Sequence, residues 1–346
     1  MALLVSLLLL DLACPLPLPT RRDTSVLVTA RDGSPLRAFA DAEGVWRYPT
    51  VPEQVSALYL QALLGYEDRW FWRHPGINPV ALLRAGGQLL GSRRIVSGGS
   101  TLTMQVARII DPGLRGSRTR TPWGKTRQLL RALQLEAHLS KREILSLYLE
   151  RAPFGGTIEG VEAASWAYLG KPAARLSHAE AALLAVLPQA PSRLRPDRAP
   201  DAARIARDKL LARMASTGAW TRAQVDDARI EPVVSRSLRP PMDAALLAQR
   251  LRNAQPAATR IASTLDPALQ RTLEERVAAY FSDLPPRTSA ALLVMDNATL
   301  EARAYIGSVA FGDKQRLGDV DMVQAWRSPG STLKPFLYGM ALDDGL

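Results

Sequence analysis

The stretch that decides the fold is EDRWFWRHPG at residues 67–76, where a run of apolar residues with helical spacing ends. It begins with two adjacent carboxylates, Glu67 and Asp68, and three large aromatic residues follow them closely. A carboxylate beside apolar rings is poorly solvated and therefore takes up a proton more readily, as a general base must. The stretch predicts a catalytic carboxylate at a helix end, and a surface charge pair is the alternative interpretation.

Helical periodicity surrounds this stretch, from about residue 54 to about residue 230. Apolar side chains recur there at intervals of three and four residues, which is typical of amphipathic helices. The predicted helices span residues 56–70, 79–90, 101–110, 125–139, 141–150, 160–169, 178–187 and 200–216. Ser177, followed three residues later by Glu180, has the pattern of a helix N-cap.

The flanking segments differ from this helical part. Residues 26–50 are expected to form short strands and turns, and residues 266–281 a further helix. Two strands, at 290–295 and 301–306, are predicted to be joined by a turn. The expected division of the chain is a partial membrane anchor or signal sequence at 1–19, a short β-containing lead-in at 20–53, a helical domain at 54–231, a linker at 232–288 and the start of another domain at 289–346.

The composition bounds the class of protein. The chain has 346 residues, enough for two domains of ordinary size, and 47% of them are hydrophobic. Lys and Arg number 44 against 33 for Asp and Glu, a formal net charge of +11, which favours an anionic partner such as nucleic acid, a phosphorylated ligand or an acidic membrane. A single cysteine excludes an internal disulfide, and three histidines are too few for a structural zinc cluster. A metal held only by carboxylates stays open.

The N-terminal run is apolar from Ala2 to Leu10, apart from Ser6, and continues to Cys14. It is shorter than the roughly 20 residues of a membrane-spanning helix and lacks the positively charged start of a signal peptide. The end of a membrane anchor is the favoured interpretation, and a short signal sequence or a buried helix are the alternatives. A stiff, proline-rich spacer follows at residues 15–19.

Two further motifs point to an anionic ligand. In SGGSTLTMQ, at residues 97–105, two glycines precede Ser100 and Thr101, which can begin a helix whose free N–H groups suit phosphate. From Arg108 to Arg127 there are six cations and one acid, and arginine side chains suit pyrophosphate oxygens. A plain helix cap and a solvated charge run are the respective alternatives.

The last motif is RSPGSTLKP at residues 327–335. Ser331 lies three residues before Lys334, so a helix would place both side chains on one face. The lysine amine can then take the serine proton, as in acyl-transfer enzymes. Ser-x-x-Lys alone is common by chance, and the flanking proline and glycine residues make this occurrence more specific.

Together and in this order, the motifs make the chain resemble the bifunctional class A penicillin-binding proteins, most closely their 1C branch. The motifs of family 51 peptidoglycan glycosyltransferases match at residues 67–76, 98–105, 125–136, 143–149 and 176–191, and the opening of a penicillin-binding transpeptidase domain matches at 327–336. The resemblance implies a mainly α, lysozyme-like glycosyltransferase domain at 54–231, followed by the linker and an incomplete α/β transpeptidase domain from residue 289.

The resemblance also implies an activity and a location. A glycosyltransferase of this family polymerises lipid II into β-1,4-linked glycan strands and releases undecaprenyl diphosphate, on the outer side of the cytoplasmic membrane. The implied partners are lipid II, the growing glycan strand, an anionic membrane surface and other proteins of cell wall synthesis, but no nucleic acid. No cofactor is required, although a divalent cation (Mg or Mn) can assist at the diphosphate.

The implied site residues follow from the matching motifs. Glu67 corresponds to the family's general base, with Asp68 beside it. The implied substrate-binding residues are Arg84, Ser100, Thr101, Gln105, Arg108, Arg120, Lys125, Arg127 and Gln128. Ser331 corresponds to the transpeptidase nucleophile and Lys334 to its base, and no residue is assigned as a metal ligand.

Three departures from the family pattern bear on activity. Gln128 stands where the third motif usually has a second catalytic carboxylate, and its neutral amide can position a group but cannot exchange a proton. Glu143 or Glu136 is the candidate for part of that role. The second motif has Met104-Gln105 in place of paired glutamines. Because no Ser-x-Asn or Lys-Thr-Gly element follows the Ser-x-x-Lys motif, we expect no independent transpeptidase or penicillin-binding activity.

Other functions remain as alternatives. A non-catalytic lipid II-binding or scaffold protein is the main one, because of Gln128 and the missing transpeptidase elements. A nucleic-acid binder is suggested by the charge alone, and the sequence has no recognisable nucleic-acid module. A glycan hydrolase also uses two carboxylates, but the cationic stretch favours transfer from a pyrophosphate donor.

Overall fold

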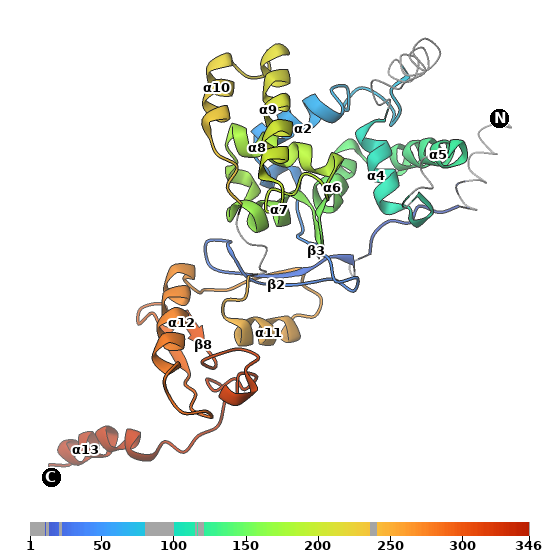
Figure 1. Cartoon of the computed structure of the whole chain (residues 1–346). Coiled ribbons are helices and arrows are strands. Elements are labelled where there is room, and N and C mark those ends of the chain that lie inside the picture. Colours follow the sequence, from blue (N-terminus) through green and yellow to red (C-terminus); the bar gives the residue numbers. More distant parts are fainter. Residues whose placement is uncertain are drawn as a thin grey trace. The chain divides into compact units, whose positions relative to one another are not determined.

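The computed structural model describes residues 11, 14–20, 23–79, 100–114, 116, 121–235 and 241–345. The chain forms two compact units (Figure 1). Unit 1 comprises Met1–Leu27, Ala38–Pro241 and Ala257–Ile261, and unit 2 comprises Val28–Arg37, Met242–Pro256 and Ala262–Leu346. None of the helices in the described ranges is long and apolar enough to span a membrane. The apolar run at residues 2–10 lies outside those ranges.

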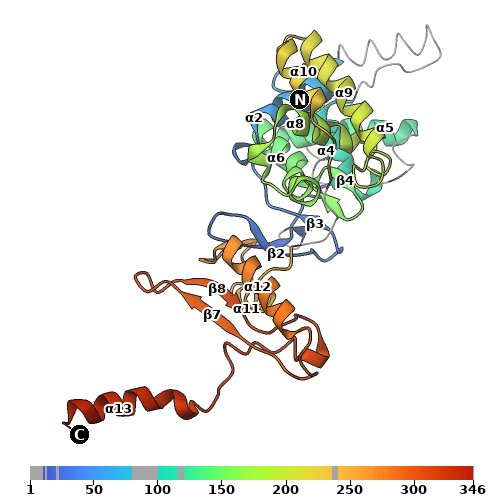
Figure 2. The same ribbon diagram turned by 60° about the vertical axis from the view of Figure 1, so that its left-hand side comes forward.

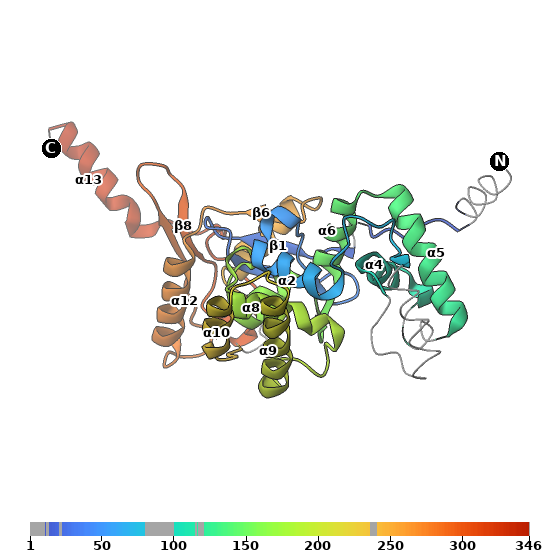
Figure 3. The ribbon, with the colours of Figure 1, turned by 90° about the horizontal axis from the view of Figure 1, so that it is seen from above.

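Unit 1 is mainly helical, as the sequence predicts. Its α-helices are α2 (Ala57–Glu67), α4 (Leu102–Ile110), α5 (Pro122–His138), α6 (Lys141–Arg151), α7 (Val161–Ala164), α8 (His178–Val186), α9 (Pro200–Ser216) and α10 (Arg222–Ile230). A π-helical turn, Ser165–Leu169, continues α7, and the short 3₁₀ helix η7 (Leu187–Gln189) continues α8. Seen from above in Figure 3, α8 lies beside α9 and near α2, and it packs against both.

Side-chain caps explain where several of these helices begin. The hydroxyl groups of Thr101, Thr121 and Ser140 each accept a hydrogen bond from a backbone N–H of the first turn, which would otherwise be unsatisfied. The predicted pair Ser177 and Glu180 forms a complete capping box at α8, in which each side chain bonds the other residue's backbone N–H. The N-cap prediction at α8 is therefore confirmed.

Helix α2 ends earlier than the sequence predicts, at Glu67 and not at Trp70. Asp68 takes an extended backbone conformation, and its carboxylate accepts a hydrogen bond from the backbone N–H of Leu102. A contact 34 residues away in sequence thus ends the helix, which apolar periodicity alone cannot indicate.

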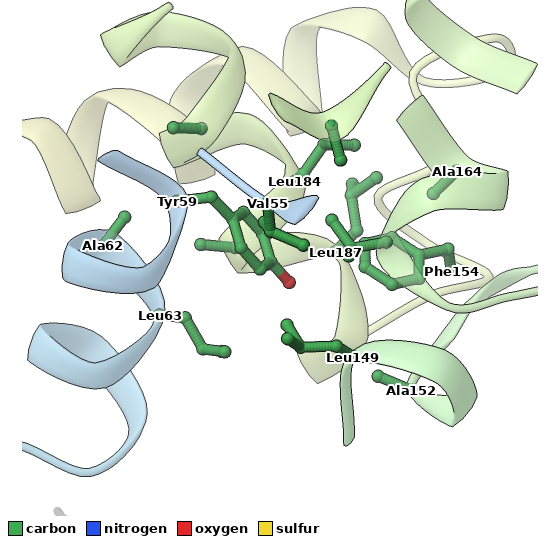
Figure 4. Packing of buried hydrophobic residues seen from close by; sticks show 14 of the residues in the cluster. Val55, Tyr59, Ala62, Leu63, Leu149, Ala152, Phe154, Ala164, Leu184 and Leu187 are labelled. Carbon is green, nitrogen blue, oxygen red and sulfur yellow. The ribbon is translucent and has the colours of Figure 1, made fainter. Parts of the chain in front are cut away.

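The core of unit 1 lies where α2, α6 and α8 meet. Figure 4 shows Tyr59 and Leu63 of α2 facing Leu149 of α6 and Leu184 of α8, and all four side chains are buried. Burial of such side chains is the main favourable term in folding. The core therefore fixes the end of α2, where Glu67 stands.

Two small three-stranded sheets join strands from distant parts of the sequence. The first joins β3 (Trp46–Arg47), β5 (Ile158–Glu159) and β4 (Pro153–Gly155) in the order β3-β5-β4, with β3 and β5 parallel and β4 and β5 antiparallel. The second has the order β2-β1-β6, from β2 (Pro35–Phe39), β1 (Val26–Thr29) and β6 (Arg260–Ala262).

Unit 2 contains the predicted hairpin. Strands β7 (Leu292–Met295) and β8 (Ala302–Ile306) pair antiparallel, with Leu293 opposite Tyr305. Figure 2 shows them side by side with helix α12 (Pro267–Phe281), which packs on β8. Helix α13 (Lys334–Asp343) follows the short 3₁₀ helix Gly330–Leu333.

The segment predicted as a linker, residues 232–288, differs from the prediction. It contains α11 (Ala245–Ala254), β6 and the expected helix α12. Leu247 of α11 is buried in a small cluster with Leu36, Leu265 and Tyr305. The many proline and arginine residues of this segment favour the prediction of a linker, although α11 has an apolar face that packs in this cluster.

Candidate active site

Glu67 lies at the last position of α2, half-buried, and two side-chain amides hold its carboxylate. Gln105 of α4 donates from Nε2 to Glu67 Oε2 at 2.6 Å, and Gln189 of η7 donates from Nε2 to Glu67 Oε1 at 2.9 Å. Each oxygen keeps further lone-pair capacity, because a carboxylate can accept about four hydrogen bonds. The carboxylate is thus fixed in orientation and still able to receive a proton.

Tyr66, the neighbouring residue, sets the orientation of one of these amides. Its hydroxyl donates to Gln189 Oε1 at 2.9 Å, which turns the Nε2 of Gln189 towards Glu67. Burial, followed by the charge of Glu67, raises the pKa of Tyr66, so this hydroxyl keeps its proton at neutral pH. The Arg213 guanidinium lies 5.5 Å from the centre of the Tyr66 ring.

Asp68 has a different role from Glu67, although the two are adjacent. Its carboxylate is buried, and both of its oxygens lie 2.9 Å from His74 Nε2. Its Oδ2 also accepts from the N–H of Leu102 at 2.9 Å, at the first residue of α4, where a negative charge is favourable. The sequence groups Asp68 with Glu67 as catalytic, and in the structure the Asp68 carboxylate joins the aromatic stretch to the start of α4.

Thr101 and Gly76 join the same two segments. The Thr101 hydroxyl donates to the Gly76 carbonyl at 2.5 Å and accepts from the N–H of Met104 at 3.1 Å. Gly76 has φ of +79°, and a Cβ there would lie 2.8 Å from the Ala132 carbonyl oxygen. Only glycine fits this position, since both the backbone conformation and the space exclude a side chain.

A partly buried polar cluster links Ser100, Lys125 and Gln128. Lys125 Nζ donates to Ser100 Oγ at 2.7 Å and to Gln128 Oε1 at 3.0 Å, and Gln128 Nε2 donates to the Met104 carbonyl at 2.6 Å. Burial, and then the charge of Arg108, lowers the pKa of Lys125. Arg108 itself is exposed on α4. Gln128 therefore fixes α5 to α4, and Lys125 and Arg108 supply cations near each other.

Arg127, predicted to bind phosphate, pairs with Asp111 in the structure. Its guanidinium forms a bidentate pair with Asp111, at 2.8 and 2.9 Å, and Arg131 approaches the same carboxylate at 3.1 Å. Burial favours the protonated form of Asp111, but the hydrogen bonds from Arg127, Gly113 and Arg131 outweigh it and hold the pKa below its usual range. The predicted phosphate ligand Arg127 is thus paired within the protein.

The two carboxylates considered for the missing acid role are both bonded elsewhere. Glu143 is exposed and closes the capping box of α6, accepting from the N–H of Ser140 at 2.8 Å, and these bonds lower its pKa. Glu136 Oε1 accepts from Thr103 Oγ1 at 2.6 Å and from Lys141 Nζ at 2.7 Å. Within the described part of the chain, neither side chain forms a hydrogen bond to Glu67, and each binds neighbouring helical segments instead.

Gln189 is the site residue that sequence reasoning missed. The motif resemblance covers residues 176–191 as a whole and implies no role for any one of their side chains. The available signal is a glutamine directly after Leu187-Pro188, where a proline disfavours continuation of the α-helix. Arg84 and Arg120 lie outside the described residues.

The Ser331 and Lys334 pair lies in unit 2 and is exposed. Ser331 is in the 3₁₀ helix that precedes α13, and Lys334 begins α13. No hydrogen bond joins the serine hydroxyl to the lysine amine in this part of the described chain. Across all described ranges, no three His, Cys, Asp or Glu side chains are grouped so that they could hold a metal ion.

Comparison with known proteins defines the class. A family model described as transglycosylase matches residues 32–215, more than half of the chain, and this chain belongs to that family. It is 56% identical over 336 residues to penicillin-binding protein 1C of Escherichia coli, covering 97% of this chain and 43% of the relative. It is 40% identical over 183 residues to penicillin-binding protein 1A of Aquifex aeolicus, covering 53% of this chain and 24% of the relative.

The chain thus spans less than half the length of these curated relatives. A crystal structure of penicillin-binding protein 1A from Haemophilus influenzae aligns with 91% of this chain and 52% of its own, at 15% identity and a TM-score of 0.36. The resemblance to class A penicillin-binding proteins that the motifs indicate is confirmed by the sequence relatives.

Proposed function

We propose that this chain is a peptidoglycan glycosyltransferase that polymerises lipid II into β-1,4-linked glycan strands and releases undecaprenyl diphosphate. The observation that carries the proposal is the Glu67 carboxylate, held by the amides of Gln105 and Gln189, in a chain of the transglycosylase family. The similarity to penicillin-binding proteins 1C and 1A supports a substrate of bacterial cell wall synthesis.

Glu67 acts as the general base in this proposal. It takes the proton of the acceptor sugar's 4-hydroxyl, and the oxygen then attacks the anomeric carbon of the donor. The new glycosidic C–O bond forms as the bond from that carbon to the diphosphate oxygen breaks, so the anomeric configuration inverts. The bonding electrons leave with the diphosphate. Two amide donors on Glu67 keep it oriented towards the acceptor without occupying all its lone pairs.

The cations of α4 and α5 stabilise the leaving group. Negative charge builds on the diphosphate in the transition state, and preorganised cations lower the free energy of that state. Arg108 is exposed, and its charge contributes to the lowered pKa of Lys125. Arg84 and Arg120 are expected to join them. No cofactor is needed for these steps, and a divalent cation would enter with the diphosphate.

The proposed location is the outer side of the cytoplasmic membrane, because the lipid substrate is anchored there. The chain's net charge of +11 supports contact with an anionic membrane surface. Other proteins of cell wall synthesis are expected partners.

The test is Glu67→Gln, assayed with labelled lipid II in detergent. Removal of a general base costs about 10²- to 10⁴-fold in rate, so polymer formation should collapse while lipid II binding survives. Glu53→Gln is the matched control, since Glu53 is an exposed carboxylate paired with Arg142. A wild-type chain that binds lipid II and makes no polymer would contradict the proposal and favour a scaffold function.

A further inference from the structure

His74 is a buried histidine whose ring has a single polar partner in the described part of the chain. The residue is 7% exposed, and its Nε2 lies 2.9 Å from each carboxylate oxygen of Asp68. An ionised carboxylate only accepts hydrogen bonds, so Nε2 carries the proton of this contact. The other ring nitrogen, Nδ1, is buried without a hydrogen-bond partner among the described residues. An unpaired buried nitrogen costs free energy, so the advantage of a histidine over an apolar ring here is its bond to Asp68.

The backbone between Asp68 and His74 folds back on itself. Two overlapping turns have N–H to carbonyl bonds from Phe71 to Asp68, at 3.0 Å, and from Arg73 to Trp70, at 2.8 Å. These turns return the chain within six residues and place the imidazole of His74 on the Asp68 carboxylate. The contact between the two side chains is therefore built into the local backbone.

The adjacent carboxylates of Glu67 and Asp68 both bind the first turn of α4. Asp68 Oδ2 accepts from the N–H of Leu102, the first residue of that helix, at 2.9 Å. Glu67 Oε2 accepts from the Gln105 side chain, three residues further along the helix, at 2.6 Å. The two bonds, the peptide link between the carboxylates and the helical turn form a closed ring. A shift of the helix start relative to Asp68 would therefore also move the Gln105 amide relative to Glu67.

We propose that His74 is a positioning residue for the Glu67 carboxylate, and that it acts through Asp68 and the start of α4. The Nε2–H of His74 lies between the two oxygens of Asp68 and holds that side chain against the N–H of Leu102. With the helix start fixed, the Gln105 amide stays at hydrogen-bond distance from Glu67. A displacement of about 1 Å caused far from the reacting atoms can cost about 100-fold in rate. The inference rests on the proposed function, in which Glu67 is the general base.

The test compares His74→Phe and His74→Gln in the full 346-residue chain, with lipid II polymerisation as the assay. Phenylalanine keeps an aromatic ring but has no N–H, so kcat should fall by about tenfold while KM stays within about twofold. Glutamine can place its amide N–H near the position of Nε2 and should keep kcat within about threefold of the wild-type value. Wild-type kcat in His74→Phe, or an equal loss in both variants, would overturn the inference.

A double variant tests the route through α4. Gln105→Ala removes the amide that His74 is inferred to position, so adding His74→Phe in that background should lower kcat by less than about twofold further. Two independent effects would multiply instead. A double variant that shows the full product of the two single losses would therefore exclude a route through Gln105.

Hydrogen exchange provides a readout that does not depend on activity. The Leu102 N–H bonds the carboxylate that His74 holds, so amides of residues 100–105 should exchange about tenfold faster in His74→Phe than in the wild type or His74→Gln. His138→Phe is the matched control, because His138 Nε2 also bonds an aspartate, Asp11, but is exposed on α5. It should leave polymerisation and this exchange unchanged. Wild-type exchange in His74→Phe would show that His74 does not hold the helix start.

The two proposals can fail separately. If the wild type makes no polymer, the glycosyltransferase proposal fails, and exchange at Leu102 still decides whether His74 holds the start of α4. If Glu67→Gln abolishes polymerisation but His74→Phe keeps the wild-type kcat, only the positioning by His74 is disproved.

Discussion

Glu67 and Ser331 both stand at a helix boundary, yet their surroundings differ. Glu67 ends α2, and amides from two other segments bind both of its oxygens. Ser331 precedes α13 within an exposed stretch, residues 324–340, and has no recorded bond to Lys334. A short motif thus identifies which residue types are present, whereas chemistry depends on the groups that other segments bring to them.

Among the variants that leave Glu67 in place, the largest effect is expected from Gln105→Ala, which removes one of the two amides that bind the Glu67 carboxylate. Hydrogen bonds to a charged group contribute about 1.5–3 kcal/mol, so loss of the 2.6 Å bond should reduce kcat/KM for lipid II polymerisation by about 10- to 100-fold. Gln249→Ala, in α11 of unit 2, is the control and should keep wild-type activity. Wild-type activity in Gln105→Ala would show that the amide does not position Glu67.

Asp111→Asn tests the packing of the helices around the site. The variant should lose about 1–2 kcal/mol of stability at pH 7, a modest value because the Arg127 side chain is 40% exposed and keeps contact with water. The pKa of Asp111 is lowered in the folded protein, so the stabilisation is complete above the unfolded pKa and is lost as the pH falls through the folded one.

The expected readout is a gap in Tm between wild type and Asp111→Asn that narrows from pH 7 towards pH 3. A gap that stays constant with pH would mean that the ion pair with Arg127 and Arg131 contributes nothing measurable.

Glu143→Gln should have a small effect, within about twofold on polymerisation. Glutamine serves at the third position of a capping box as well as glutamate does, so α6 should keep its start. Rates from the lipid II assay, with circular dichroism as a check on helix content, measure both aspects. A loss of about a hundredfold with intact helices would instead make Glu143 the second catalytic carboxylate.

The smallest effect is expected from Ser331→Ala. Polymerisation should be unchanged, and neither the wild type nor the variant should retain a fluorescent penicillin, because the serine lacks a bonded base. If the wild type is labelled and Ser331→Ala is not, an exposed Ser-x-x-Lys pair is sufficient for acylation. Bonded partners of the kind that hold Glu67 would then not be needed at Ser331.

Local sequence signals were enough for many elements. Helix α9 has the predicted bounds, and α6 and α8 begin at caps formed by neighbours in the sequence. The contacts that define the site join distant segments, as Gln189 does with Glu67 across 122 residues. The partners of Asp68 and Arg127 are likewise distant in sequence, so the sequence indicates neither the bond of Asp68 to Leu102 nor that of Arg127 to Asp111.

The amide of Gln128 has two partners that only an amide can satisfy together. Its amide accepts from Lys125 and donates to the Met104 carbonyl, two tasks that require opposite ends of one side chain. An ionised glutamate would perform the first and would face the carbonyl oxygen with a second negative group. Gln128→Glu should therefore weaken the contact between α5 and α4 that the amide makes.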